Sequence, residues 1–310
     1  MTLYPKYREL EKIENGRRSA WGVFGSEDDL GTANFLSPAA VTAAAREIRT
    51  GERVNLSLPL DLPTPPFFGR TPLRHEIFRH SELVLDDVMD NFFPQASSQW
   101  DGLRHRKDPD AGFYNGVSEE EAGAGGSRLG VENWAQQGIV GRGVLLDLPR
   151  FGGIDDYDPF VPHRIDVRMI NRVLDAERVV LSDGDILLVR TGYMGAYLAA
   201  PIGDRGLLRD KVSSAGLDAA EEMAEFLWDN RIAAAAGDNP GLEALPRNPE
   251  LPDLHSRLIP MLGFVIGEFW ALDALAEASA RDGRYTCFLT SVPLNLPGGV
   301  GTPANAIALR

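Results

Sequence analysis

Residues 186–236 read ILLVRTGYMGAYLAAPIGDRGLLRDKVSSAGLDAAEEMAEFLWDNRIAAAA and contain the clearest strand–helix–strand pattern in the chain. The two ends, 186–191 and 232–236, are short continuous apolar runs, which are typical of strands covered on both faces. Between them, residues 217–230 have the apolar spacing of an amphipathic helix. This alternation predicts an α/β layer structure.

The same alternation continues outward from this stretch. Toward the N-terminus, Ser37 and Pro38 fit the cap and first turn of a helix that runs to Arg49, just before Gly51. Prolines at 63, 65, 66 and 72 predict an irregular loop over residues 61–73. We also predict strands over 54–60, 144–148, 263–267 and 286–294, and helices over 167–176 and 269–280. We expect one domain over residues 1–310, with an N-terminal extension over about residues 1–35.

Composition excludes several classes of protein. With 44% hydrophobic and 25% charged residues, the 310-residue chain is neither disordered nor fibrous. Its single cysteine, Cys287, excludes an intramolecular disulfide and a multi-cysteine zinc site. The net charge of −14 argues against a nucleic-acid partner, because phosphate binding needs a basic surface.

The chain has no pattern that predicts a membrane or export segment. Residues 1–18 contain no apolar run of signal-peptide length. The most apolar long window, 258–276, is interrupted by Pro260, Glu268 and Asp273, and we interpret it as a buried strand leading into a helix. We therefore expect a cytoplasmic protein without membrane contact.

Polar side chains that can bind a metal or transfer a proton recur in residues 95–105, QASSQWDGLRH. Taken alone, this segment is a polar loop with one histidine. Two distant features favour a site. Glu268 follows the apolar run 264–266, thirteen residues after His255, and an acid at the end of a buried strand is costly unless it is paired or metal-bound. Asp238 lies in a turn that follows a predicted buried strand, where α/β proteins build their sites.

These residues, in this order, resemble the cyclase family of metal-dependent hydrolases, which includes bacterial kynurenine formamidase and isatin hydrolase. The family motif H-x-G-T-H-x-D-x-x-x-H aligns with residues 95–105. Further segments that match in the same order are 21–22, 29–34, 141–147, 188–192 and 238–240, followed by His255 and Glu268. The resemblance implies a swivelling β/β/α fold, in which a central barrel-like mixed sheet carries the site and helices pack outside.

The motif departs from the family at two positions, where Gln95 and Gln99 replace histidines. The resemblance implies one divalent metal ion, manganese or zinc, held by Asp101, His255, Glu268 and Gln99. It also implies catalytic roles for Asp101 and for His105, which would transfer protons. The residues that we expect to contact the substrate are Gln95, Trp100, Phe93, Tyr114, Asn115, Asp238 and Trp270.

The leading functional hypothesis is a hydrolase of an amide, lactam or lactone bond in a small cyclic or aromatic substrate, assembled as a homodimer or homotetramer. Two alternatives remain open. The glutamines in the motif are compatible with a metal-independent enzyme in which Asp101 and His105 act as an acid/base pair. The chain could also be a catalytically silent relative that binds a small molecule.

Overall fold

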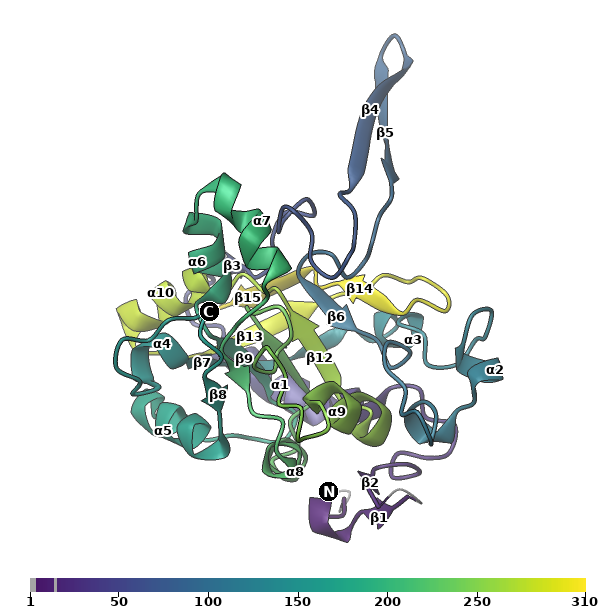
Figure 1. Cartoon of the computed structure of the whole chain (residues 1–310), viewed down its shortest axis with the longest axis vertical. Coiled ribbons are helices and arrows are strands. Elements are labelled where there is room, and N and C mark those ends of the chain that lie inside the picture. Colours follow the sequence, from purple (N-terminus) through teal and green to yellow (C-terminus); the bar gives the residue numbers. More distant parts are fainter. Residues whose placement is uncertain (1–3, 14–15) are drawn as a thin grey trace.

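The centre of the computed structural model, which describes residues 4–13 and 16–310, is a curled nine-stranded mixed sheet with helices outside it (Figure 1). Its strands, in spatial order, are β14 (Gly301–Pro303), β6 (Gln99–Asp101), β12 (Val265–Glu268), β11 (Ala234–Gly237), β9 (Ile186–Arg190), β7 (Ile139–Asp147), β13 (Thr286–Ser291), β15 (Ala306–Leu309) and β3 (Arg53–Asn55). The four strands from β12 to β7 are parallel, and their flanking neighbours are antiparallel. The predicted α/β fold with a central barrel-like mixed sheet is confirmed.

Several α-helices begin at polar caps that are visible in the sequence. The side chains of Ser37, Asp166 and Asp253 accept hydrogen bonds from the first turns of α1, α5 and α9. The α-helices are α1 (Pro38–Ala44), α2 (Glu119–Ala122), α3 (Glu132–Ala135), α4 (Leu148–Phe151), α5 (Val167–Glu177), α6 (Tyr193–Ala199), α7 (Ile202–Asp210), α8 (Glu221–Asp229), α9 (Leu254–Leu262) and α10 (Asp273–Asp282). Short 3-10 helices cover Tyr7–Glu9, Gly31–Phe35, Ala45–Glu47 and Tyr114–Gly116. Within the described residues, no helix has the length and apolar character needed to cross a bilayer.

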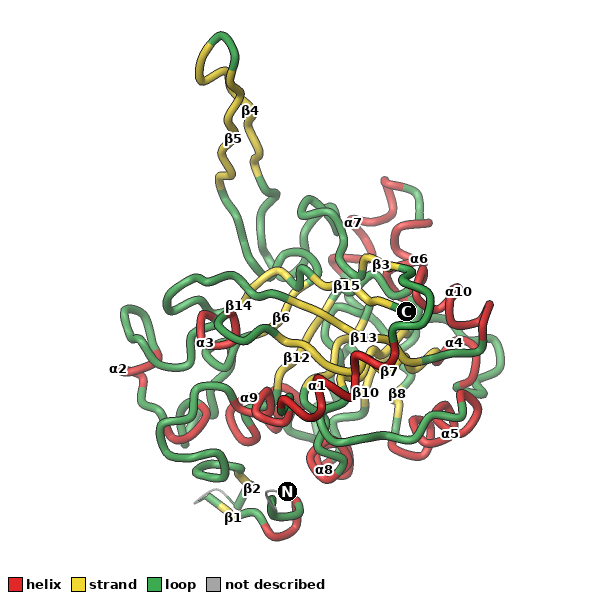
Figure 2. The backbone as a smooth tube through the Cα atoms, turned by 180° about the vertical axis from the view of Figure 1, so that it is seen from behind, coloured by secondary structure: helices red, strands yellow, loops and turns green. Residues whose placement is uncertain are grey.

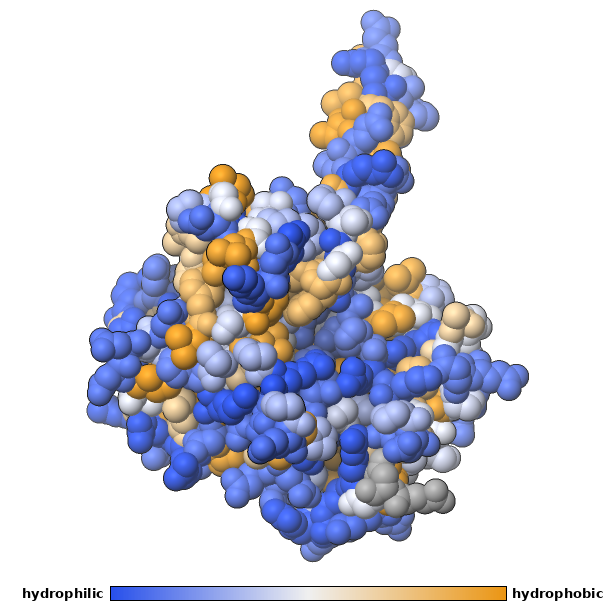
Figure 3. All heavy atoms as spheres, viewed as in Figure 1, coloured by the Kyte–Doolittle hydropathy of each residue, from blue (hydrophilic) through white to orange (hydrophobic). Residues whose placement is uncertain are grey.

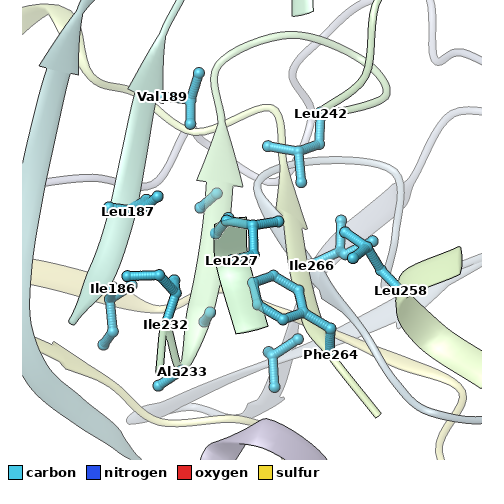
Figure 4. Close-up of a cluster of buried hydrophobic side chains, with 14 of the residues drawn as sticks. Ile186, Leu187, Val189, Leu227, Ile232, Ala233, Leu242, Leu258, Phe264 and Ile266 are labelled. Carbon is cyan, nitrogen blue, oxygen red and sulfur yellow. The ribbon is translucent and has the colours of Figure 1, made fainter. Parts of the chain in front are cut away.

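The apolar strands are buried on both faces, as their continuous runs predict. Leu187 and Val189 of β9 and Ile266 of β12 have no exposed surface. In Figure 4, Leu227 of α8 and Leu258 of α9 lie in the same cluster. The parallel part of the sheet therefore forms a rigid base from which the strand ends project their polar residues.

Several predicted boundaries differ from the structure. The helix predicted to run to Arg49 ends at Ala44 and continues as a 3-10 turn, and the strand predicted over 54–60 is reduced to Arg53–Asn55. The interpretation of 258–276 as a strand leading into a helix is wrong at its start, because residues 258–262 end helix α9. Nearly every residue of α9 is buried, so its apolar run lacks the polar face that distinguishes a surface helix.

The N-terminal segment lies against the body of the protein. Tyr7 and Leu10 are buried, and strands β1 (Glu11–Lys12) and β2 (Arg18–Ser19) form a small ribbon. The backbone N–H of Thr32 donates to the Gly263 carbonyl at 2.8 Å. Of the extension predicted over residues 1–35, positions 1–3 and 14–15 lie outside the described residues.

A long β-hairpin projects from the body (Figures 1 and 2). It consists of β4 (Arg74–Ser81) and β5 (Val84–Asp90), and every side chain in both strands is exposed. Figure 3 shows apolar side chains along this arm. The exposed apolar residues of the arm include Ile77, Leu83 and Leu85. A third pair of strands, β8 (Arg164–Ile165) and β10 (Gly216–Leu217), lies apart from the main sheet.

Glu177, at the end of α5, makes folding stability depend on pH. Its Oε1 accepts from the Asp147 backbone N–H at 2.9 Å, its Oε2 has no partner among the described residues, and burial raises its pKa from 4.5 to about 8. The folded state therefore binds more protons than the unfolded state between pH 4.5 and 8, so this contribution to stability is lost as the pH rises through that window. We expect Glu177→Gln, which keeps the acceptor, to match wild type at pH 5 and to exceed its unfolding free energy by about 2–4 kcal/mol at pH 9. Urea denaturation at both pH values measures this difference, and an equal difference at both would contradict it.

Candidate active site

Asp101 of β6 and Glu268 of β12 lie close together where these two strands pair. The antiparallel register places Gln99 opposite Glu268 and Asp101 opposite Ile266. The Gln99 amide Nε2 donates to Glu268 Oε2 at 2.6 Å. Because side chains alternate along a strand, Gln99 and Asp101 share one face of β6 and Trp100 lies on the other.

A buried histidine completes the cluster. His255 lies in the first turn of α9, and its Nε2 is 3.1 Å from Glu268 Oε1 and 3.7 Å from Asp101 Oδ2. Its other ring nitrogen, Nδ1, is 2.8 Å from Oε1 of Glu243. Glu243 also accepts from the Leu254 backbone N–H at 2.9 Å, so one carboxylate fixes both the helix start and the imidazole ring. Nε2 therefore faces the two acids.

His105 borders this cluster from the loop that follows β6. The Gln95 amide Nε2 is 2.9 Å from His105 Nδ1 and also donates to Asp101 Oδ1. His105 Nε2 is 3.9 Å from Asp101 Oδ2. Gln95 thus links Asp101 to His105, and Nε2 of the His105 ring faces the Asp101 carboxylate.

Burial and charge set the protonation of these groups. Burial lowers the pKa of His105 despite the nearby Asp101 carboxylate, which favours the neutral imidazole near pH 7. Burial, together with the charge of Asp101, raises the pKa of Glu268 to about 7. Burial alone would lower the pKa of His255 and raise that of Asp101. For His255, contacts with Asp101, Glu243 and Glu268 outweigh the effect of burial and raise its pKa. For Asp101, contacts with His105, His255 and Gln95 outweigh burial and hold its pKa below the ordinary value.

The donor atoms of the cluster fit a divalent cation. One ligand atom each from Asp101, His255 and Glu268 lie within 4.8 Å of one another, and all three residues are buried. Asp101 Oδ2 and the Gln99 amide oxygen are buried without a hydrogen-bond partner among the described residues. Unsatisfied buried acceptors are costly, and a cation that accepts electron pairs from them removes that cost. Two carboxylates, an imidazole and an amide oxygen form a donor set that suits a divalent metal ion.

The cluster opens into a cavity of about 520 Å³. Its lining residues are Phe68, Arg70, His105, Arg106, Pro240, Gly241, Leu245, Arg247, His255 and Glu268. Pro240 and Gly241 follow the carboxyl end of β11, and Glu268 ends β12, so the cavity lies at the carboxyl ends of the parallel strands.

The aromatic residues expected to contact the substrate lie elsewhere. Trp100 and Trp270 are fully buried and pack edge to face, with ring centroids 4.7 Å apart. Trp100 Nε1 donates to Ser291 Oγ and Trp270 Nε1 to the Gln99 carbonyl, so both are core residues. Phe93 follows the projecting hairpin and does not line the cavity. We therefore do not retain these three as substrate contacts.

Three polar residues of the expected substrate set are also held by the protein itself. The Tyr114 hydroxyl donates to Asp28 Oδ2 at 3.0 Å, and the Asn115 amide donates to the carbonyls of residues 25 and 26. Asp238 accepts from the backbone N–H and hydroxyl of Thr191, and burial raises its pKa to about 6. Tyr114 and Asn115 therefore hold residues 25–28 of the N-terminal segment in place. Asp238 links the end of β11 to the end of β9. Of the expected set, Gln95 is the residue that contacts the cluster.

Sequence reasoning missed Glu243 and the arginines of the cavity. Glu243 stands among apolar residues in the segment Leu242–Leu245, which is the same signal that identified Glu268. Arg70 lies in a proline-rich loop, Arg106 and Arg247 lie in other loops, and none of the three carries a comparable signal. They are brought to the cavity only by the tertiary fold.

Glu243 should tune the affinity of the cluster for metal. We expect Glu243→Gln to weaken manganese or zinc binding by about 10- to 100-fold, because the neutral amide orients and polarises His255 less well than the carboxylate. Competition titration against a chelator measures this affinity. Glu250→Gln, which removes the same charge from an exposed position, is the matched control. Equal affinities for both variants would contradict a supporting role for Glu243.

Comparisons with known proteins agree with this architecture. A family described as "Putative cyclase" matches residues 54–244. A solved structure described as a novel cyclase is 34% identical, with a TM-score of 0.84, and the match covers 94% of this chain and 99% of that one.

More distant solved structures share the fold. Isatin hydrolase A from Labrenzia aggregata, bound to benzyl benzoate, is 19% identical with a TM-score of 0.60, covering 88% of this chain and 98% of that one. A predicted metal-dependent hydrolase from Bacillus stearothermophilus is 17% identical with a TM-score of 0.52, covering 83% and 97%. No match was found among the curated proteins. The family match spans more than half of the chain, and we conclude that this protein belongs to the Putative cyclase family.

Proposed function

We propose that the protein is a metal-dependent hydrolase of an amide, lactam or lactone bond in a small cyclic or aromatic substrate. The observation that carries this proposal is the buried Asp101, His255 and Glu268 cluster beside a cavity that His105 also lines. Structural neighbours described as isatin hydrolases and as a predicted metal-dependent hydrolase support it.

Asp101, His255 and Glu268 would hold the ion, with the Gln99 amide oxygen as a further donor. Manganese and zinc both suit a set of oxygen and imidazole ligands. When bound, such an ion lowers the pKa of water and polarises a carbonyl group. Glu243 keeps the His255 ring in place through Nδ1, so that Nε2 stays directed at the acids.

His105 would move the protons of the reaction. Its Nδ1 lies against the Gln95 amide. When that amide turns its oxygen toward Nδ1, the ring proton is held on Nδ1 and Nε2 is free to accept a proton. Its lowered pKa keeps it neutral near pH 7, so it can take a proton from the attacking water. The imidazolium then donates that proton to the leaving nitrogen or oxygen as the C–N or C–O bond breaks.

A panel of formamides, lactams and lactones, assayed with manganese or zinc and after exhaustive chelation, tests the proposed function. We expect hydrolysis of at least one class that is lost on chelation and restored by one of the two ions. Turnover that survives chelation would favour the metal-independent acid/base enzyme. Ligand binding without turnover of any compound would favour the silent relative.

We further propose that the β4–β5 arm joins two copies of this chain. An isolated two-stranded hairpin is marginally stable in water, yet this arm exposes several large apolar side chains, with Leu83 at 93%. Arginine and histidine of β4 pair with aspartates of β5 within the arm, as His75 Nε2 does at 2.7 Å from Asp87 Oδ2. The exposed apolar side chains are therefore the surface that a second copy of the arm would cover.

Ile77 and Leu85 lie on the same face of the arm, since Ile77 pairs with Asp87 and Arg79 with Leu85. We expect light scattering to give wild type a multiple of 33.9 kDa, and the double variant Ile77→Ser, Leu85→Ser the mass of one chain. Val180→Ser, at an exposed position on the body, is the control and should keep the wild-type mass. A monomeric wild type, or a double variant of unchanged mass, would contradict this proposal.

A further inference from the structure

Three arginines line the cavity, and they differ in whether an acidic side chain pairs with them. Arg106 is paired with Asp253 through Nη2 at 2.5 Å, and its Nε is buried without a hydrogen-bond partner among the described residues. Arg247 is 3.1 Å from Glu243 Oε1 and 3.6 Å from Asp253 Oδ2. Arg70 forms no ion pair with any described residue, and its Nη1 is buried without a hydrogen-bond partner. A buried guanidinium nitrogen without an acceptor is costly and indicates an acceptor supplied from outside the chain.

The loop that carries Arg70 is held in place relative to the cluster of Asp101, His255 and Glu268. The Arg70 backbone N–H donates to the Phe67 carbonyl at 3.2 Å. Phe67 is buried against Tyr197 and Phe269, with ring centroids 5.5 and 5.3 Å away, and Phe269 directly follows Glu268. The Arg70 guanidinium also lies 5.7 Å from the centre of the Phe68 ring. These contacts hold Arg70 at the wall of the cavity that Glu268, His105 and His255 line.

We propose that Arg70 binds an anionic group of the substrate, so that this enzyme selects cyclic amides or lactones that carry a carboxylate. A guanidinium presents paired N–H donors that match the two oxygens of a carboxylate, and it stays charged at any working pH. A cavity of about 520 Å³ suits a ligand of one or two rings. This assignment names the substrate class of the proposed hydrolase and rests on that function, but the anion site can be tested without turnover.

Binding provides the first test. Calorimetry on manganese-loaded protein would compare phthalate, which carries two carboxylates, with benzoate, which carries one. We expect wild type to bind phthalate about 10- to 100-fold more tightly than benzoate, as a charge-assisted hydrogen-bonded pair allows. Arg70→Gln should reduce this preference to within about twofold, whereas Arg247→Gln, which removes an already paired arginine, should keep it. Equal binding of both acids by wild type, or equal loss of preference in both variants, would overturn the proposal.

Hydrolysis provides the second test, with a lactone that bears a ring carboxylate and the same lactone with a carboxamide in its place. We expect wild type to prefer the carboxylate form in kcat/KM by about 10- to 100-fold and Arg70→Gln to lose this preference by slowing that form alone. Equal slowing of both forms would mean that Arg70 acts on the reacting carbonyl, and would overturn the proposal. If neither lactone reacts while phthalate binding still depends on Arg70, the hydrolase proposal fails and the anion site stands.

Discussion

Replacing Asp101 by asparagine is expected to lower kcat/KM for hydrolysis by about a thousandfold or more. Asp101 contributes the buried, unpartnered Oδ2 to the cluster with His255 and Glu268. The amide keeps an oxygen that can accept from Gln95 but removes one negative charge from a site that must neutralise a dication. Since the metal supplies several kcal/mol of transition-state stabilisation and each 1.36 kcal/mol is tenfold in rate, its loss has an effect of this size.

The same variant should lose metal and remain folded. In the metal-free state its melting temperature should fall by no more than a few degrees, because the variant gives up the attraction of His105 and His255 for the carboxylate but keeps an oxygen that accepts from Gln95. Asp86→Asn, on the exposed arm, removes an equal charge and should retain both metal and activity. An Asp101→Asn protein with wild-type activity and metal content would contradict the role of Asp101 as a ligand.

The second large effect is expected for His105→Gln, which should lower kcat by about 100- to 10,000-fold, the usual contribution of general acid–base catalysis. Metal content should be unchanged, because His105 lies outside the group of ligand atoms formed by Asp101, His255 and Glu268. This separates the variant from Asp101→Asn, in which metal and activity are lost together.

The role of His105 as a proton donor also predicts how the activity defect of His105→Gln depends on the leaving group of the substrate. Esters with a nitrophenolate leaving group need little protonation of the departing oxygen, whereas alkyl esters and amides need it fully. The His105→Gln defect should therefore shrink as the pKa of the leaving group falls. A defect of the same size for every leaving group would show that His105 does not protonate the leaving atom.

The sequence was informative about the sheet because its strands are buried on both faces. The continuous apolar runs that predict strands near 186–191 and 232–236 correspond to β9 and β11, with boundaries shifted by up to a few residues. The strand predicted over 286–294 corresponds to β13, whose residues are alternately half-buried and buried. The projecting hairpin had no such signal, since its strands mix charged and apolar residues on both faces. The fully apolar helix α9 could not be separated from a strand by periodicity.

The site was predictable where local patterns carry the chemistry. The family motif put Gln99 and Asp101 in one site, and the structure places them on one face of β6, a strand that was not predicted. The acid after the apolar run 264–266 lies beside His255. The alternation of side chains along β6 explains why Trp100 packs in the core. Glu243 and Arg70 reach the site through the tertiary fold, from a turn after β11 and from a proline-rich loop. No spacing rule within one segment could have joined them to residues 95–105.

The metal content of the purified protein tests the central claim most directly. Plasma mass spectrometry would be applied to extensively dialysed wild type and to an Asp101→Ala, Glu268→Ala double variant, after soaking each with manganese and zinc. We predict close to one equivalent of manganese or zinc in wild type and none in the double variant. Wild-type protein that retains no metal after soaking would contradict the claim that these buried acids and His255 form a metal centre.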